Sequence, residues 1–232
     1  MATAKLEVLK ITSDEPVWLW YRSDTALTLS LHQDAIVTEN ENLLIIQRGG
    51  DEKRGGTPFM TNEMIVYYTT LGLLSIIERS FLFCMLVMFV ADLAWYPKQR
   101  LYTLRASPYY SLSEIVVDGN GMTTIDASCI SPESCRIHTK GHGGGVTIVG
   151  KSHTKMLSVR VSSESCVSMP DLGADTATLC VTRHGGRIDG VHIIKLGVLS
   201  LEHDSEIVYT RDPRCSIRRS MNSRGTIAEM TK

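Results

Sequence analysis

The sequence predicts an α+β protein that is mostly β, with an antiparallel, sandwich-like or barrel-like C-terminal region and an apolar helical segment in the middle. Three observations predict this class. Short runs of alternating apolar and polar residues occupy both ends of the chain, and glycine-containing turns separate many of these runs. One stretch near residue 80 is far more apolar than the rest of the chain.

The composition allows a folded protein of one large or two small domains. The chain has 232 residues, of which 43% are hydrophobic, and this is enough to form a core. Its formal net charge of -1 gives no reason to expect a strong overall attraction to nucleic acid or anionic lipid. The composition excludes a wholly disordered chain, a collagen-like chain and a disulfide-rich scaffold.

Residues 1–57 are predicted to form an N-terminal β region. Four segments alternate in the manner of strands, at about 5–11, 16–21, 26–32 and 43–47. Paired glycines then flank four charged residues at 49–56, which is typical of a mobile turn or a linker. We place the first domain boundary there.

Residues 58–105 are predicted to contain the apolar helical segment. The run from 64 to 96 is interrupted only by Glu78, Arg79 and Asp92, and its two clean apolar stretches hold 14 and 12 residues. A helix that spans a bilayer needs about 20 apolar residues, so neither stretch is long enough by itself. Three interpretations stay open: a pair of buried helices, an interfacial or hairpin membrane segment, and an oligomerisation surface. The candidate functional residues of this apolar segment are Leu82, Phe83, Leu86, Phe89 and Trp95.

Residues 106–210 are predicted to form a β-sandwich-like domain of about eight strands. Asp118-Gly119-Asn120-Gly121 and other glycine-rich stretches separate the alternating runs and favour hairpins. No internal repeat of fixed period is apparent. Residues 211–232 contain five arginines and one lysine against two acidic residues, which is typical of a flexible basic tail. Its arginines are candidates for contact with phosphate or a membrane: Arg211, Arg214, Arg218, Arg219 and Arg224.

One segment matches the G-x-x-x-x-G-K-S pattern of nucleotide-binding P-loops through Gly145, Gly150, Lys151 and Ser152. A working P-loop follows a buried strand and opens a helix, because backbone N–H groups at the helix N-terminus hold the phosphates. The residues after Ser152 instead alternate like a strand. We therefore treat nucleotide binding as a minor alternative and expect no cofactor.

Cys135, His138 and His142 have a spacing that zinc ligands use, and they form a minor candidate metal site. Structural zinc sites usually combine two close pairs of ligands, and the second pair is missing here. The six cysteines are too sparse for a disulfide scaffold, and the first residues do not resemble a secretory signal. We expect an intracellular, cytoplasmic protein with reduced thiols, either free or peripheral to a membrane.

These features favour a non-catalytic structural or interaction protein that associates with itself and works at a membrane surface. In architecture only, two β regions around an apolar helical stretch resemble small viral matrix, movement or accessory membrane proteins. This resemblance implies homo-oligomerisation, a host-cell setting and contact with membrane lipid or nucleoprotein, and no small-molecule substrate is inferred. The alternatives are a nucleic-acid-binding β protein that uses the basic tail with Trp18 and Trp20, and a P-loop enzyme.

Overall fold

A computed structural model describes residues 7–12, 17–21, 27–32, 35–39, 43–47, 99–103, 111–162, 164–183, 185–222 and 224–230. The chain divides into two compact units, of which one combines Met1–Gly49 with Gln99–Lys232 and the other is Gly50–Lys98. The second unit lies outside the described residues. The predicted helical run from 64 to 96 lies there too.

The described part of the first unit consists almost entirely of β-strands. They are β1 (Val8–Thr12), β2 (Val17–Tyr21), β3 (Leu27–His32), β4 (Ile36–Glu39), β5 (Leu43–Gln47), β6 (Gln99–Thr103), β7 (Glu114–Val117), β8 (Met122–Asp126), β9 (Ser134–Thr139), β10 (Gly145–Val149), β11 (Ser152–Val161), β12 (Cys166–Ser168), β13 (Leu172–Val181), β14 (Arg187–Leu201), β15 (Glu206–Arg211), β16 (Ser216–Met221) and β17 (Thr226–Glu229). A short 3-10 helix, Ala127–Cys129, follows β8. The strand segments predicted in residues 1–50 are confirmed, and β4 is an additional one.

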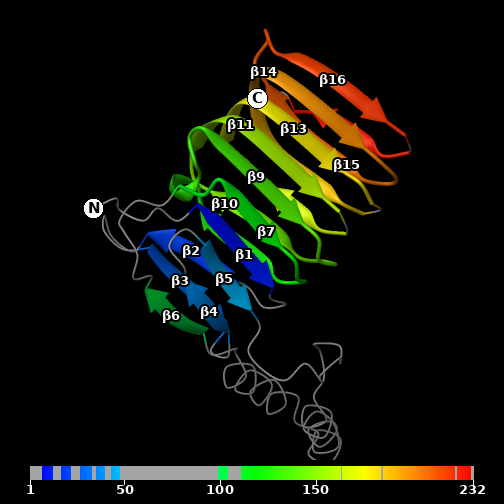
Figure 1. Ribbon diagram of the computed structural model, residues 1–232. Helices are drawn as coiled ribbons and strands as arrows, with labels where there is room; N and C mark the ends of the chain where they lie inside the picture. Colours follow the sequence, from blue (N-terminus) through cyan, green and yellow to red (C-terminus); the bar gives the residue numbers. More distant parts are fainter. Residues whose placement is uncertain are drawn as a thin grey trace, which may run out of the picture. The chain divides into compact units, whose positions relative to one another are not determined.

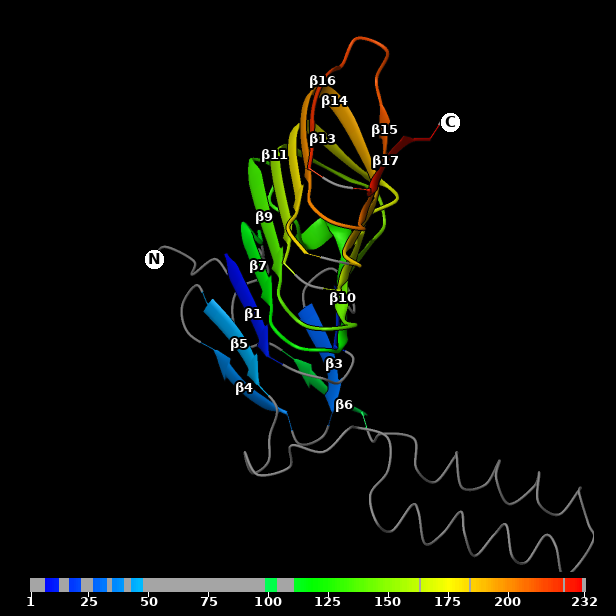
Figure 2. The same ribbon diagram turned by 90° about the vertical axis from the view of Figure 1, so that its right-hand side faces the viewer.

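The strands form two sheets that face each other (Figures 1 and 2). Sheet I has the strand order β4, β5, β1, β7, β9, β11, β13, β14, β16. Sheet II has the order β6, β3, β2, β8, β10, β12, β14, β15, β17. From β7 onward the chain alternates between the sheets, so that each rung consists of one strand segment in each sheet.

The prediction of an α+β class with an antiparallel sandwich or barrel is wrong, because the strands from β7 onward pair in parallel and form a β-solenoid. Antiparallel pairs occur at β2–β3, β3–β6 and β4–β5. The glycine-containing turn at 118–121 joins β7 in sheet I to β8 in sheet II and is therefore a corner of the solenoid. Turn residues look the same in a hairpin and in a corner, so this motif does not distinguish the two folds.

The predicted boundary near residue 57 does not separate two domains, since β1 pairs with β7 and β2 pairs with β8. The chain does contain a structural repeat, but the repeat has no fixed period. Glu114 pairs with Arg136, 22 positions later, whereas Leu196 pairs with Ser216, 20 positions later. The rung length therefore drifts along the chain, which hides the repeat from a search at fixed period.

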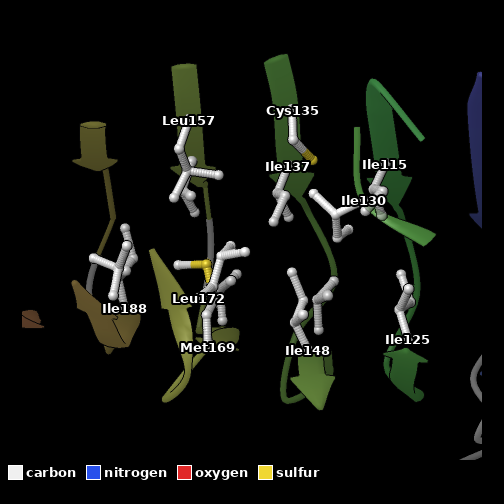
Figure 3. Close-up of a cluster of buried hydrophobic side chains, with 14 of the residues drawn as sticks. Ile115, Ile125, Ile130, Cys135, Ile137, Ile148, Leu157, Met169, Leu172 and Ile188 are labelled. Carbon is white, nitrogen blue, oxygen red and sulfur yellow. The ribbon is translucent and has the colours of Figure 1, made fainter. Parts of the chain in front are cut away.

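The core lies between the two sheets and is formed by the inward residues of each strand (Figure 3). Because side chains alternate along a strand, every second residue points inward and stacks on its register partner in the next rung. One such column runs through Ile115, Ile137 and Val159, all of which are fully or almost fully buried. Ile125 and Ile148 form a column on the facing sheet. Stacked β-branched and aliphatic side chains thus hold the rungs together.

Strand β14 belongs to both sheets. Its first residues pair with β12 and β15 in sheet II, and its later residues pair with β13 and β16 in sheet I. The register shifts between Asp189 and Val191, at Gly190, whose φ is 90°. This φ lies in the left-handed region that glycine adopts without a steric cost. Gly190 therefore accommodates a bulge in β14, whose pairing with β15 continues as far as Ile193.

Candidate functional site

The predicted basic tail, residues 211–232, is largely ordered as the C-terminal rung, which we define as residues 212–230. The prediction of a flexible tail is thus wrong for the strands β16 and β17, which pair with β14 and β15. Backbone pairing fixes this segment although its sequence is strongly basic. The candidate site is built on this rung, because it holds or adjoins all five predicted arginines.

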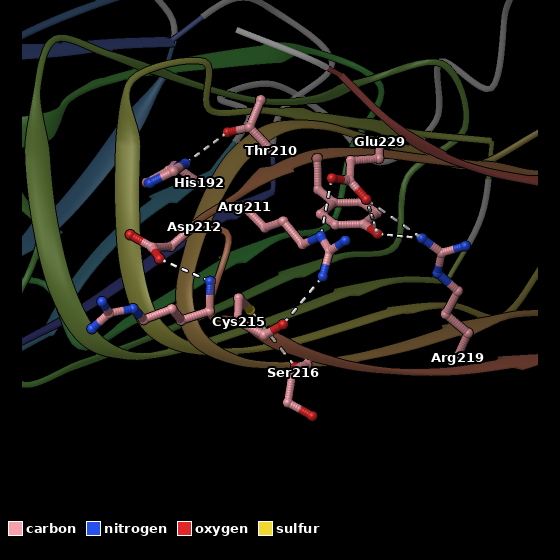
Figure 4. A network of polar contacts seen from close by, with 10 residues as sticks. His192, Thr210, Arg211, Asp212, Cys215, Ser216, Arg219 and Glu229 are labelled. Carbon is pink, nitrogen blue, oxygen red and sulfur yellow. Dashed lines mark hydrogen bonds and ion pairs between the residues drawn. The ribbon is translucent and has the colours of Figure 1, made fainter.

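Two of the five arginines are bound to Glu229 of β17 (Figure 4). Arg211 Nε donates to Glu229 Oε1 over 3.0 Å, and Arg211 Nη1 donates to the backbone oxygen of Cys215 over 3.2 Å. The hydrogen bond and the charge of Glu229 raise the pKa of Arg211. Arg219 Nη2 lies 3.9 Å from Glu229 Oε2. One carboxylate therefore neutralises part of the charge of two guanidinium groups.

Tyr209 of β15 connects these groups from inside the core. It is fully buried, and its hydroxyl accepts a hydrogen bond from Arg219 Nη2 and donates to Glu229 Oε2 over 3.4 Å. The guanidinium carbon of Arg219 lies 5.7 Å from the centroid of the tyrosine ring, within the range of a cation–π contact. These hydrogen bonds and ion pairs connect four residues: Tyr209, Arg211, Arg219 and Glu229.

All five predicted arginines are exposed, including the three that do not contact Glu229. Arg214 lies in the corner between β15 and β16, Arg218 points outward from β16, and Arg224 lies in the corner between β16 and β17. Within the described part of the chain, no ion pair involves any of the three. Two exposed methionines, Met221 at 45% and Met230 at 46%, belong to the same rung.

Sequence reasoning did not find Tyr209 and Glu229. Tyr209 pairs with Glu229 in register, 20 positions later, in the same way that Leu199 pairs with Arg219. The 20-residue spacing of the last rungs would have placed Glu229 next to Tyr209 and Arg219 next to Leu199. That spacing was the missing signal, because each of these residues looks like an isolated strand or tail position without it.

The segment matching a P-loop forms a strand, a corner and a second strand. Gly145 begins β10, Gly150 and Lys151 form the corner, and Ser152 begins β11. A Cβ atom on Gly145 would lie 1.9 Å from the backbone oxygen of Cys166 in the next rung, so close stacking of rungs explains this glycine. Gly150 has a φ of 97°, which the corner requires. The helix that a P-loop opens has no counterpart in this segment.

The predicted metal ligands do not converge. Cys135 of β9 points into the core, where burial raises its pKa to about 12. His138 points outward from the same strand, and its Nε2 lies 3.0 Å from Ser162 Oγ. Burial, and then the positive charges of Lys140 and Arg160, lower the pKa of His138. His142 is exposed in the following corner. In the described ranges, no group of three or more histidine, cysteine or acidic side chains is placed to hold a metal ion.

The apolar contact residues Leu82, Phe83, Leu86, Phe89 and Trp95 lie outside the described residues. Among the residues that are described, no helix has the length and the apolar character needed to cross a membrane.

Comparisons with protein-family models, with curated proteins and with solved structures found no match to this chain.

Proposed function

We propose that this protein is a structural or interaction protein that docks on an anionic membrane surface through its C-terminal rung. The observation that carries the proposal is the set of three exposed arginines, Arg214, Arg218 and Arg224, on the C-terminal rung. Arginine pairs well with phosphate because its planar guanidinium donates several hydrogen bonds in fixed directions.

The spacing of the three arginines favours an extended anionic surface over a small ligand. They lie along one strand and its two corners, and extended backbone rises about 3.3 Å per residue. Ten residues separate Arg214 from Arg224, so the row is up to about 33 Å long. A single phosphate group contacts only one part of such a row, whereas a layer of lipid headgroups contacts all of it.

The two exposed methionines favour lipid over nucleic acid. Met221 and Met230 expose apolar side chains in the same rung as the arginines, and Met221 stacks in register on Leu201. Apolar side chains next to basic ones are typical of protein surfaces that lie in the interface of a bilayer. A surface that binds single-stranded nucleic acid uses aromatic side chains for base stacking, and the aromatic ring of this end, Tyr209, is buried.

Flotation of the full-length protein with phosphatidylserine-containing vesicles and with neutral vesicles tests the proposal. Each arginine near an anionic surface contributes about 1 kcal/mol, so we expect Arg214→Ala, Arg218→Ala and Arg224→Ala together to weaken binding about 100-fold. High salt should weaken wild-type binding in the same direction, because it screens exposed charges.

A matched control removes three exposed basic residues from other rungs: Lys140→Ala, Lys151→Ala and Arg160→Ala. This variant has the same net charge as the test variant and should bind close to wild type. Equal losses in both variants would show that binding follows total charge and not the C-terminal rung. Unchanged vesicle binding of the test variant would contradict the proposal. So would a wild-type protein that binds RNA but not vesicles, if the test variant loses this RNA binding.

A further inference from the structure

The C-terminal rung changes the character of the solenoid core. One inward column continues from Leu179 to Leu199, and both are fully buried, but its next member is Arg219. On the facing sheet, the column that contains Tyr209 ends with Glu229. Two positions that are apolar or aromatic in the preceding rung are therefore charged in this rung.

The rung also has two strand edges that are open within the described residues, since β16 pairs with β14 and β17 pairs with β15. The N–H of Asn222 donates to Leu201 O, and the N–H groups of Thr226 and Met230 donate to β15 and its preceding corner. Because backbone groups alternate in direction along a strand, the N–H and C=O groups of Arg219 and Glu229 point toward the open edges. The charged side chains thus belong to the residues whose backbone is available for pairing.

Open edges of this kind are templates for pairing with another chain. The neighbouring inward residues would favour such pairing, since Ile217 and Ile227 are apolar and only partly buried. Pairing of two copies at this end would bury Arg211, Arg219 and Glu229 of each copy. Each copy would bury two positive charges against one negative charge, which is costly in a medium of low dielectric constant.

We propose that Arg219 and Glu229 form an end cap that prevents β16 and β17 from pairing with the same end of a second copy of this chain. Inward-pointing charges at sheet edges and polar terminal repeats are general devices that keep β-sheets and solenoids from extending. The hydrogen bonds of both residues to Tyr209 hold the charges over the core. Any self-association of this protein then uses another surface.

The test replaces the two charges in the full-length protein, with Arg219→Leu and Glu229→Leu. Light scattering after size-exclusion chromatography, at a series of concentrations and without lipid, should give at least twice the mass of the wild type. Circular dichroism should retain the β signal. A second variant, Arg219→Gln with Glu229→Gln, removes the charges but keeps hydrogen-bonding groups near Tyr209. Its mass should also be higher than that of the wild type.

A matched control adds the same leucines at outward positions of the same strands, through Arg218→Leu and Thr226→Leu. It should keep the wild-type mass, because the cap is intact. Adding Met221→Pro to the leucine cap variant should reverse its association, because it removes an N–H that points toward the open edge. Wild-type mass in both cap variants while they are folded, or equal association of the control, would overturn the proposal. The readout needs no membrane, so it does not depend on the proposed function.

Discussion

Tyr209 links the core of the solenoid to its end. Its ring is fully buried, while its hydroxyl contacts both Arg219 and Glu229. A buried hydroxyl is costly without hydrogen bonds, so the two contacts make a large aromatic residue compatible with this place. In return, the tyrosine fixes the positions of two side chains that would otherwise move in solvent.

We predict that Tyr209→Phe destabilises the protein by about 1–2 kcal/mol, because it removes hydrogen bonds to charged groups and leaves the packing of the ring intact. Urea unfolding followed by circular dichroism measures this loss. The same substitution in a variant that already carries Glu229→Gln should cost less. An equal loss in both backgrounds would show that the hydroxyl and Glu229 do not act together.

At the scale of the strand, Gly190 is the position where β14 shifts its register against β15. A Cβ atom there would lie 2.7 Å from the Cα of Pro170, and φ is 90°. Gly150 has a similar φ of 97°, but the nearest atom to its Cβ position is 3.8 Å away. An alanine at Gly150 therefore has the cost of the backbone angle alone. An alanine at Gly190 has this cost and also the cost of a close contact.

We predict that Gly150→Ala costs about 1–2 kcal/mol, which is typical of a residue forced into the left-handed region. Gly190→Ala should cost more, because the backbone of Pro170 must also move. Thermal and urea unfolding of both variants measures the difference. Equal losses would show that the rungs at Gly190 separate easily.

A ladder of alternating charges crosses four successive rungs of sheet I. Lys155 Nζ lies 2.8 Å from Glu133, Lys195 Nζ lies 2.7 Å from Asp175 Oδ2, and His153 Nε2 lies 3.3 Å from Asp175 Oδ1. The hydrogen bond from Lys195 is the main cause that lowers the pKa of Asp175. The charged side chains of neighbouring rungs lie close enough to pair only when the strands are in the correct register. The ladder therefore favours that register.

We predict that Asp175→Asn lowers stability at neutral pH and that its difference from the wild type disappears in acid. The folded protein holds the pKa of Asp175 below the ordinary value of 3.8, so its contribution is present above that value and is lost as the pH falls through the lower, folded-state pKa. Unfolding midpoints between pH 7 and pH 2 measure this. As a control, Asp171→Asn removes an exposed carboxylate one corner away. A difference that persists at the acid end would contradict this explanation.

The strands were largely predictable from sequence, but their partners were not. Alternation in the segment 135–139 correctly predicts a strand with one buried face, whereas the segment 206–210 forms a strand whose residues 207–210 are all buried. The alternation of Ile115 and Val117 is the same whether the neighbouring strand runs parallel or antiparallel. The corners then decide the fold, and Asp-Gly or Asn-Gly suits a corner as well as a hairpin. The basic composition of residues 211–232 was enough to identify the arginines of the site. Glu229 could be identified only from its register with Tyr209, 20 positions earlier.

At the scale of the whole described unit, the rungs form a nearly one-dimensional array in which each one contacts its neighbours. Removing one complete rung should therefore leave a shorter solenoid. Deletion of residues 157–176 joins Met156 to Ala177, and Ala177 is the register partner of Leu157. Every inward side chain after the junction then still points inward.

We predict that this 20-residue deletion gives a folded protein with a lower unfolding temperature. Deletion of residues 157–175 removes one residue fewer and turns every later side chain of the strand to the opposite face. That variant should fail to fold or should aggregate. Circular dichroism and thermal unfolding distinguish the two. Similar behaviour of both deletions would contradict the register described here.

The two pairings that join the N-terminal strands to the solenoid span more of the chain than the other pairings do. Most rungs close after about 20 residues, but Val8 pairs with Glu114 and Val17 pairs with Thr123, each across 106 positions. Closing a loop five times longer costs about 1.4 kcal/mol more chain entropy. Rungs from β7 onward can nucleate locally and propagate along the chain, so we expect β1 and β2 to dock late, onto rungs that have already folded.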